Sequence, residues 1–284
     1  MCSAPEISQI TIREIDDHAQ MRAVEELQKE VWRTPDLDVV PLTQLVAVKE
    51  AGGVLIGAFD GETLVGFIYG FPSYEVGRLA HHSHMLAVKP AYRNSDLGRR
   101  LKLAQREHVI KQGIDLMSWT FDPLQSLNAH FNFNKLGVLS DRYLVNFYGE
   151  DAPSFLHQTG TDRLWVSWFV LSDHVKQRIA GIANNTTSVG LPLVQVAADD
   201  SSERRDLAEA LSQPTASIEI PSDINALQPQ RTATALRWRE DTRWAFTEAL
   251  HAGYVVAGFV REKRGEQIVG RYLLRRGTLL DVVK

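Results

Sequence analysis

The fold of this chain is decided by the stretch His84-Met85-Leu86-Ala87-Val88-Lys89-Pro90-Ala91-Tyr92-Arg93-Asn94-Ser95-Asp96-Leu97-Gly98-Arg99-Arg100. It begins as an apolar strand, passes through a polar turn and continues into a basic helix. The first N–H groups of a helix have no partner within the helix, and the helix dipole adds positive potential there. This turn therefore predicts a binding site for an anionic ligand.

The bulk composition is that of an ordinary globular protein. The 284 residues suffice for one large domain or two modest ones, with 44% hydrophobic and 23% charged residues. A net charge of −4 favours neither nucleic acid nor membrane, and no apolar run approaches the roughly 20 residues that span a bilayer. The single cysteine, Cys2, excludes a disulfide framework, and the sequence shows no signal pattern, so we expect a cytoplasmic protein.

Apolar periodicity predicts a mixed α/β order in the first part of the chain. Asp60-Gly61 is a hairpin signal, because glycine accepts the positive φ that such turns need. Prolines 35 and 41 predict a loop, and residues 72–77 a turn. The expected strands are 7–15, 53–59, 63–71, 81–88, 115–121, 138–147 and 164–171, and the expected helices are 17–32, 97–113 and 126–136.

A change of composition near residue 182 predicts a second unit. We expect a first domain over residues 1–175, a linker over 176–190 and a C-terminal α+β unit over 191–284. The last unit contains a helix over about 231–252 and strand-like runs on either side of it. It is too small to form a generous core alone, so it should pack on the first domain or on a partner chain, as in a homodimer.

Two motifs resemble those of the GNAT (Gcn5-related N-acetyltransferase) superfamily. Residues 93–98, Arg-Asn-Ser-Asp-Leu-Gly, are similar to its acyl-CoA-binding signature, Arg/Gln-x-x-Gly-x-Gly/Ala. About 35 residues downstream, residues 128–138 (NAHFNFNKLGV) resemble the family region Asn-x-x-Ala-x-x-Phe-Tyr-Glu-Lys-Leu-Gly-Phe. The resemblance covers residues 7–171 and implies a GNAT-like α/β fold, a mixed and mostly antiparallel sheet flanked by helices.

The resemblance implies acetyl-CoA or another acyl-CoA as co-substrate, without a metal. In the family, N–H groups of the turn bind the pyrophosphate, and the pantetheine arm lies where the two neighbouring strands separate. A strand N–H, here that of Leu86 or Val88, can polarise the thioester carbonyl. The residues expected to line the cofactor are Leu86, Ala87, Val88, Arg93, Asn94, Ser95, Asp96, Leu97, Gly98, Arg99, Asn128, Phe131, Asn132 and Lys135.

Two positions depart from the family pattern. Asp96 replaces the first glycine of the signature, and its carboxylate repels a pyrophosphate unless it caps the helix. Phe133 replaces the tyrosine that protonates the departing thiolate, a role that Tyr143, Tyr148 or a water could take. Coenzyme A thiolate can also leave without a specific acid. These departures keep an alternative open, a non-catalytic module that binds or senses acyl-CoA.

The candidate bases are histidines of the strand before the turn. His82 and His84 share one face of that strand, His81 faces the other way, and a pKa near 6.5 suits deprotonation of an ammonium. Asp122 could act as base or bind the substrate amine, or simply shape the turn before Pro123. Structural hydrogen bonding is the alternative for each histidine. A metal site lacks a supporting carboxylate or cysteine pattern.

The sequence thus predicts an N-acyltransferase that transfers an acyl group from coenzyme A to a primary amine of a small molecule or amino acid. Acetyl is the acyl group expected ahead of others. Direct attack is favoured over an acyl-enzyme, because Cys2 is the only thiol. The expected partner is the amine acceptor, with no nucleic acid and no membrane. On the C-terminal helix, four arginines could bind a carboxylate or form structural ion pairs with acidic neighbours: Arg231, Arg237, Arg239 and Arg243.

Overall fold

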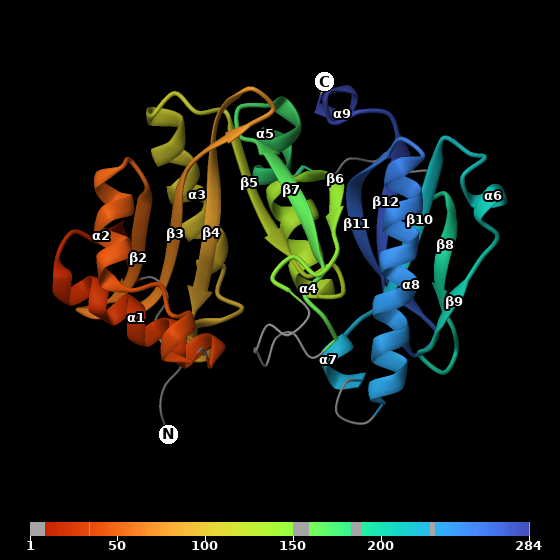
Figure 1. Cartoon of the computed structure of the whole chain (residues 1–284), viewed down its shortest axis with the longest axis horizontal. Coiled ribbons are helices and arrows are strands. Elements are labelled where there is room, and N and C mark those ends of the chain that lie inside the picture. The colour runs from red at the N-terminus through yellow and green to blue at the C-terminus, as the bar shows by residue number, and fades with distance from the viewer. Residues whose placement is uncertain (1–8, 34, 150–158, 183–188, 228–230, 284) are drawn as a thin grey trace. The chain divides into compact units, whose positions relative to one another are not determined.

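The computed structural model describes residues 9–33, 35–149, 159–182, 189–227 and 231–283 (Figure 1). These residues form two compact units, which meet in the chain between Trp119 and Thr120. The first unit contains the polar turn of the signature, and the second contains the motif at residues 128–138.

The first unit is a sheet with helices on both faces. Its described strands follow the order β1-β2-β3-β4-β5, antiparallel except for the parallel pair β4 and β5. The strands are β1 (Thr11–Glu14), β2 (Val54–Asp60), β3 (Thr63–Glu75), β4 (Arg78–Val88) and β5 (Leu116–Phe121). The helices are α1 (His18–Trp32), η2 (Asp36–Asp38), α2 (Leu42–Glu50), η3 (Pro90–Tyr92) and α3 (Leu97–Lys111).

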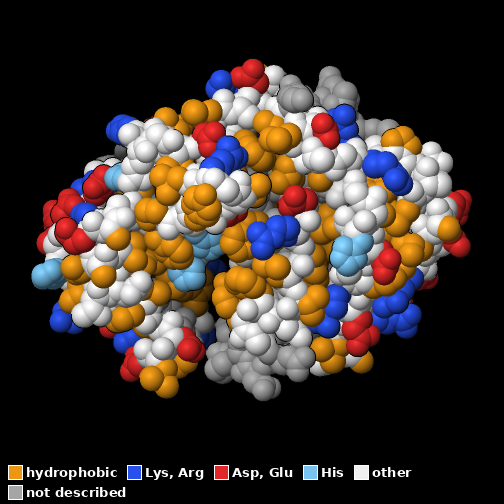
Figure 2. Space-filling model, turned by 45° about the horizontal axis from the view of Figure 1, so that its top comes forward, with side chains coloured by type: hydrophobic (Ala, Val, Ile, Leu, Met, Phe, Trp, Pro, Cys, Tyr) orange, Lys and Arg blue, Asp and Glu red, His pale blue; other side chains and the backbone are white. Residues whose placement is uncertain are grey.

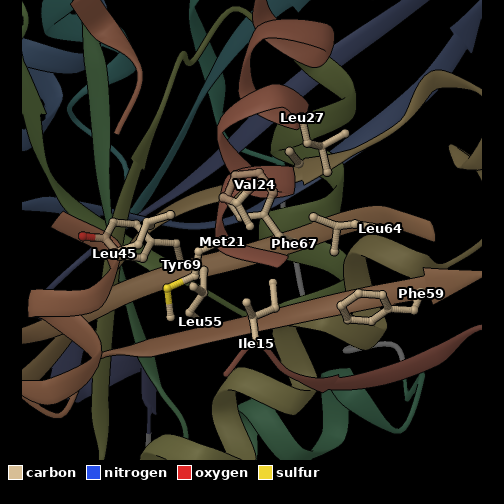
Figure 3. Close-up of a cluster of buried hydrophobic side chains, with 11 residues drawn as sticks. Ile15, Met21, Val24, Leu27, Leu45, Leu55, Phe59, Leu64, Phe67 and Tyr69 are labelled. Carbon is tan, nitrogen blue, oxygen red and sulfur yellow. The ribbon is translucent and has the colours of Figure 1, made fainter. Parts of the chain in front are cut away.

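Helices α1 and α2 cover one face of this sheet. Asp17 caps α1 by accepting a hydrogen bond of 2.7 Å from the Gln20 N–H. Figure 3 shows the apolar side chains of the two helices gathered against those of β2 and β3. Each fully buried side chain of this size contributes about 1.5–3 kcal/mol, so this cluster holds the helices on the sheet.

Helix α3 packs on the opposite face, where Gly70 lets two side chains meet over β3. A Cβ at Gly70 would lie 2.4 Å from His81 Nε2 and 2.7 Å from Gln105 Nε2. His81 and Gln105, which face each other there at 3.1 Å, therefore need the missing side chain. This glycine allows β4 and α3 to approach across the central strand.

The hairpin of β3 and β4 is longer than the sequence predicts. Residues 72–75, expected to form a turn, belong to β3, and only Val76 and Gly77 separate Glu75 from its partner Arg78. The pairing of β2 with β3 ends at Gly70, so Pro72 lies where β3 needs no N–H on that side. Cross-strand pairing thus overrides the local turn signal.

The second unit is a sheet crossed by the long helix α8 (Thr232–His251). Its described strands follow the order β7-β6-β11-β12-β10-β8-β9. They are β6 (Leu139–Leu144), β7 (Arg163–Phe169), β8 (Leu191–Val196), β9 (Ser202–Arg204), β10 (Thr215–Pro221), β11 (Tyr254–Arg264) and β12 (Gln267–Arg276). The other helices are α4 (Ser126–His130), η4 (Phe131–Leu136), α5 (Asp173–Ile179), α6 (Leu207–Ala210), α7 (Ile224–Leu227) and α9 (Leu279–Val283). No described helix, α8 included, has the length and apolar character needed to cross a membrane.

The compact units differ from the domain boundaries that composition suggests. Strand β6 pairs with β11 through Ser140 and Val256, so strands from the middle of the chain share a sheet with the C-terminal part. Residues 176–179 of the expected linker form the end of α5, and residues 183–188 lie outside the described ranges. The expected strand 7–15 is observed as β1, and residues 7 and 8 are also outside.

Candidate functional site

The turn between β4 and α3 has the backbone of an anion-binding site. Asn94 and Asp96 both have positive φ, 62° and 61°. Asp96 is the left-handed N-cap of α3 and is followed by Leu97 in right-handed helix. Such an alternation of hand directs successive N–H groups into one concavity, and the first N–H groups of α3 lie beside it. The turn therefore offers several backbone donors to an anion.

Asp96 takes up the conformation that a glycine would provide. Aspartate tolerates left-handed backbone better than most residues. Its side chain makes no cap hydrogen bond, and Arg99 Nη1 lies 3.2 Å from its Oδ2. The carboxylate is thus paired with a cation on the first turn of the helix, which reduces its repulsion of a bound anion.

Gly98 has no side chain although the protein itself leaves room for one. It lies within α3 and outside the positive-φ residues. A Cβ there would have, within 4 Å, only Leu86 Cδ2 as a neighbour, at the ordinary distance of 3.8 Å among the described residues. Neither backbone conformation nor packing in the described chain requires glycine. The open surface at the helix start suits the close approach of a ligand.

Side chains of the turn brace its backbone. Ser95 Oγ donates a hydrogen bond of 2.5 Å to the Tyr92 carbonyl, and Arg93 Nε donates one of 3.2 Å to the Val88 carbonyl. Arg100 donates to a backbone carbonyl just before β1, at 2.8 Å. The turn is therefore held by hydrogen bonds to the end of β4, to its own backbone and to the segment before β1.

Strands β4 and β5 pair only over a short distance. Their ladder joins His81 to Met117 and His82 to Ser118, and β4 then continues to Val88. On the other edge of β4, the Lys89 N–H donates to the Val65 carbonyl of β3 at 2.9 Å. Because N–H directions alternate along a strand, Leu86 and Val88 direct theirs away from β3. This is the orientation that their expected role toward a thioester requires.

His82 and His84 lie together on one face of β4, as expected. Their ring centroids are 6.0 Å apart, and Phe71 of β3 lies within 5.7 Å of both rings. His82 is half-buried and His84 is exposed. Figure 2 shows histidine side chains among hydrophobic ones on the surface in view. Loss of water lowers the pKa of both rings, that of His82 to about 4 with smaller contributions from His84 and Lys102.

The opposite face of β4 carries a buried polar cluster with α3. His81 is fully buried, and burial is the main cause that lowers its pKa to about 3. Lys102 is 3% exposed, donates to Ser83 Oγ at 2.9 Å and places Nζ 3.4 Å from the centroid of Trp119. Burial lowers the pKa of Lys102 well below its ordinary value. Sequence reasoning missed this burial, because Lys102 is one of several basic residues along the helix.

Asp122, in the second unit, is tied to a buried arginine. Both of its carboxylate oxygens lie 2.8 Å from Arg239 Nη2, and Oδ1 also accepts from the Leu124 N–H. Arg239 is only 2% exposed. Arg243 is paired in the same way with the fully buried Asp162 at 2.8 Å. These two α8 arginines therefore form ion pairs with aspartates distant in sequence, whereas Arg237 pairs with its helical neighbour Asp241 at 3.7 Å.

The second motif forms a helix with an unusual turn. Helix α4 continues directly into the π-helix η4, which Gly137 ends in left-handed conformation. The sequence predicts a regular helix over 126–136, and the π-turn accommodates an extra residue within it. Phe133 is buried edge-on against Tyr272, with ring centroids 5.8 Å apart.

The two tyrosines expected as substitutes for Phe133 differ in environment. Tyr143 donates to Asp162 Oδ2 at 2.7 Å, and burial raises its pKa. Tyr148 is 47% exposed. Tyr143 is therefore committed to a buried network, whereas Tyr148 is open to solvent.

The expected site residues fall into both compact units. The first unit holds the histidines, the strand residues 86–88 and the turn residues 93–99, and the second holds Asp122, Asn128, Phe131, Asn132 and Lys135. Within the described ranges, no three His, Cys, Asp or Glu side chains gather as metal ligands would. The anion-binding turn and the two histidines form the candidate site of the first unit.

Comparison with protein families gives one match. Residues 16–137 match the model of the acetyltransferase (GNAT) family. A search of curated proteins gave no significant match. Among solved structures, aminoglycoside 6'-acetyltransferase type Ii is 21% identical, with a TM-score of 0.46 over 57% of this chain and 97% of that one.

Two further structures cover the same share of this chain. An aminoglycoside 6'-N-acetyltransferase complexed with coenzyme A is 19% identical over 97% of its length, with a TM-score of 0.43. The ribosomal-protein-S18-alanine N-acetyltransferase from Escherichia coli is 13% identical over 94% of its length, with a TM-score of 0.44.

The family match contains both motifs on which the resemblance depends. It begins just before α1, includes the turn at residues 93–98 and ends at Gly137, the residue that terminates η4. The mixed sheet with helices on both faces is the fold expected for that family, and further strands and helices follow it. Residues 16–137 of this chain are thus similar to a GNAT acetyltransferase domain.

Proposed function

We propose that this protein is an acyl-CoA-dependent N-acyltransferase that transfers an acyl group to a primary amine of a small molecule or amino acid. Acetyl is the acyl group that we propose ahead of others. The family match supports acetyltransferase chemistry. The observation that carries the cofactor assignment is the glycine at position 98. It lies at the start of a helix preceded by an anion-binding turn, and none of its described neighbours requires a residue without a side chain there.

The chain's own residues would bind acyl-CoA along β4 and the turn. Backbone N–H groups around Asp96, Leu97 and Gly98 would bind the pyrophosphate. The free edge of β4 would pair with the pantetheine amides, and the N–H of Leu86 or Val88 would polarise the thioester carbonyl. From the second motif, the proposed cofactor contacts are Asn128, Phe131, Asn132 and Lys135.

An attacking amine must first lose its proton. His84 and His82 are the proposed bases, because their lowered pKa values keep them unprotonated at neutral pH. The nitrogen then attacks the thioester carbon, and the C–S bond breaks as coenzyme A leaves. We assign Asp122 a structural role, since both of its oxygens are occupied by Arg239.

The second candidate is a module that binds acyl-CoA without turnover. Two observations favour it: the carboxylate of Asp96 in the turn, and the buried Phe133 where a proton donor stands in the family. The two candidate bases on one face of β4, His82 and His84, favour the enzyme instead.

The deciding experiment measures thiol release from acetyl-CoA and succinyl-CoA across a panel of primary amines. Release that depends on the amine supports the enzyme. Tight binding of coenzyme A without turnover on any amine supports the module. If coenzyme A neither binds nor raises the thermal stability, both candidates fail, because a ligand that binds the folded state must stabilise it.

A further inference from the structure

A chain of three polar side chains runs from β4 through β5 to the end of β3. Ser118 of β5 lies opposite His82 in the ladder, and its Oγ is 3.3 Å from His82 Nδ1. The same hydroxyl donates to Glu75 Oε1. Ser118 is fully buried, whereas Glu75 is half-buried at the end of the hairpin. A single hydroxyl thus connects a candidate base to a carboxylate near solvent.

The direction of these hydrogen bonds follows from the number of protons. An ionised carboxylate only accepts, so the one Ser118 proton is used for Glu75. The Ser118 oxygen can then only accept from the imidazole, which places a proton on His82 Nδ1. In a neutral ring the other nitrogen, Nε2, then carries no proton and is the acceptor. The network therefore selects the tautomer in which Nε2 can take a proton.

We propose that Ser118 and Glu75 are positioning residues that fix His82 as the base of acyl transfer and relay its proton toward solvent. The proposal rests on the N-acyltransferase function argued above. The ammonium of the acceptor gives a proton to His82 Nε2, the Nδ1 proton passes to Ser118 Oγ, and the Ser118 proton passes to Glu75. The amine gains its lone pair, and the proton is finally held by a carboxylate that can release it to water.

The relay removes a difficulty that His82 would face alone. Protonation of His82 is disfavoured by its burial and, to a smaller extent, by its neighbours His84 and Lys102. A proton that stayed on this ring would create a cation that is poorly solvated. Transfer through Ser118 to the Glu75 carboxylate avoids an imidazolium at this position.

The tautomer can be tested without any activity. Ring nitrogen NMR of the full chain, labelled at histidine, should show His82 at neutral pH with Nδ1 protonated and Nε2 bare. Ser118→Ala should abolish this preference, and Ser73→Ala should leave it unchanged. Ser73 is a suitable control because it lies in the same hairpin and its buried Oγ has no hydrogen-bond partner among the described residues. An Nε2–H tautomer in the unmodified protein would overturn the proposal.

Kinetics test the proton path. With acetyl-CoA and an amine that supports turnover, Ser118→Ala and Glu75→Gln should each lower kcat about tenfold or more, at an unchanged KM for acetyl-CoA. Ser118→Thr keeps the hydroxyl and should restore much of the rate. Glu62→Gln, a change of the same kind in the exposed β2–β3 turn, is the control and should have no effect. Equal rates in all variants would exclude the relay.

A failure of the relay can be distinguished from a failure of the proposed N-acyltransferase function. Absence of turnover in the unmodified protein on every amine argues against the proposed function, while the NMR result still decides whether the relay fixes the tautomer. Turnover that survives both relay variants argues against the relay alone.

Discussion

Arg99 Nη1 lies 3.2 Å from Asp96 Oδ2, so the carboxylate that stands in place of a signature glycine is paired with the first turn of the helix it precedes. We predict that Asp96→Gly tightens coenzyme A binding about fivefold, because an exposed charge near an anion costs about 1 kcal/mol. Titration calorimetry at two salt concentrations would measure this, with the gain smaller at higher salt. Weaker binding by the glycine variant would mean that the carboxylate assists the turn.

Gly98→Ala should separate folding from binding. We expect the free energy of unfolding to stay the same or rise by up to about 1 kcal/mol, because alanine favours helix and its Cβ meets no obstacle. Coenzyme A binding should weaken at least tenfold, seen as a lost thermal shift. Gly258→Ala, where a Cβ also finds ordinary contact distances, is the control and should bind normally. A Gly98→Ala variant with normal affinity would place the pyrophosphate elsewhere.

The buried His81 should make the protein sensitive to acid. Its pKa is about 3 in the folded state and about 6.5 when unfolded, so the unfolded state binds more protons between these values. Stability is therefore constant above about pH 6.5 and falls as the pH drops toward 3, by on the order of 5 kcal/mol from this residue. Chemical denaturation at a series of pH values measures the slope.

A matched pair of histidine variants tests whether His81 causes this dependence of stability on pH. His81→Gln removes one titrating ring and should reduce the fall between pH 6.5 and 3, leaving the part that His82 contributes, even if the variant is less stable at pH 7. His18→Gln changes an exposed histidine at the start of α1 and should leave the slope as it is. An unchanged slope in His81→Gln would show that another group controls acid unfolding.

Lys102 is a cation buried against a hydroxyl and an aromatic ring. We predict that Lys102→Met is neutral or stabilising at pH 7, since an apolar side chain of similar length removes the cost of burying an amine. Ser83 keeps its hydrogen bond to Gln105 in this variant. Urea denaturation is the measurement, and a loss of more than about 2 kcal/mol would show that the amine is essential to the cluster.

Breaking the pair of Asp122 and Arg239 should cost stability rather than catalysis. Asp122→Ala leaves a buried guanidinium without its carboxylate, so we expect a loss of about 3–5 kcal/mol. A double-mutant cycle with Arg239→Met should recover part of this loss. If Asp122→Ala instead lowered kcat at unchanged stability, Asp122 would be a catalytic residue after all.

Residues with strong local signals were predicted correctly. Gly61 lies in the β2–β3 turn, and the strand–turn–helix around Asp96 has the expected form. Each of these depends on the chemistry of one residue and its nearest neighbours in the chain. Short elements such as α6 and β9 were not predicted, because they have neither apolar periodicity nor a comparable local signal.

Features that depend on distant residues could not be predicted. The burial of Lys102 follows from Trp119 and Ser83, and the pairing of Asp122 follows from an arginine 117 residues away. The link from His82 to Glu75 needs Ser118, which was not among the expected site residues. Sequence patterns show which residue types are available, and three-dimensional proximity decides which of them interact.

The pairing of β6 with β11 has a consequence for how the chain can be shortened. A polypeptide cut after residue 190 would keep the whole segment that matches the acetyltransferase family, yet it would leave the edge of β6 at Ser140 without Val256. It would also lose Tyr272, which packs on Phe133 and donates to the Pro123 carbonyl at 2.6 Å. An uncovered strand edge beside an exposed aromatic ring promotes association between copies. Such a fragment should therefore precipitate when produced alone, and become soluble again when residues 191–284 are supplied as a separate polypeptide.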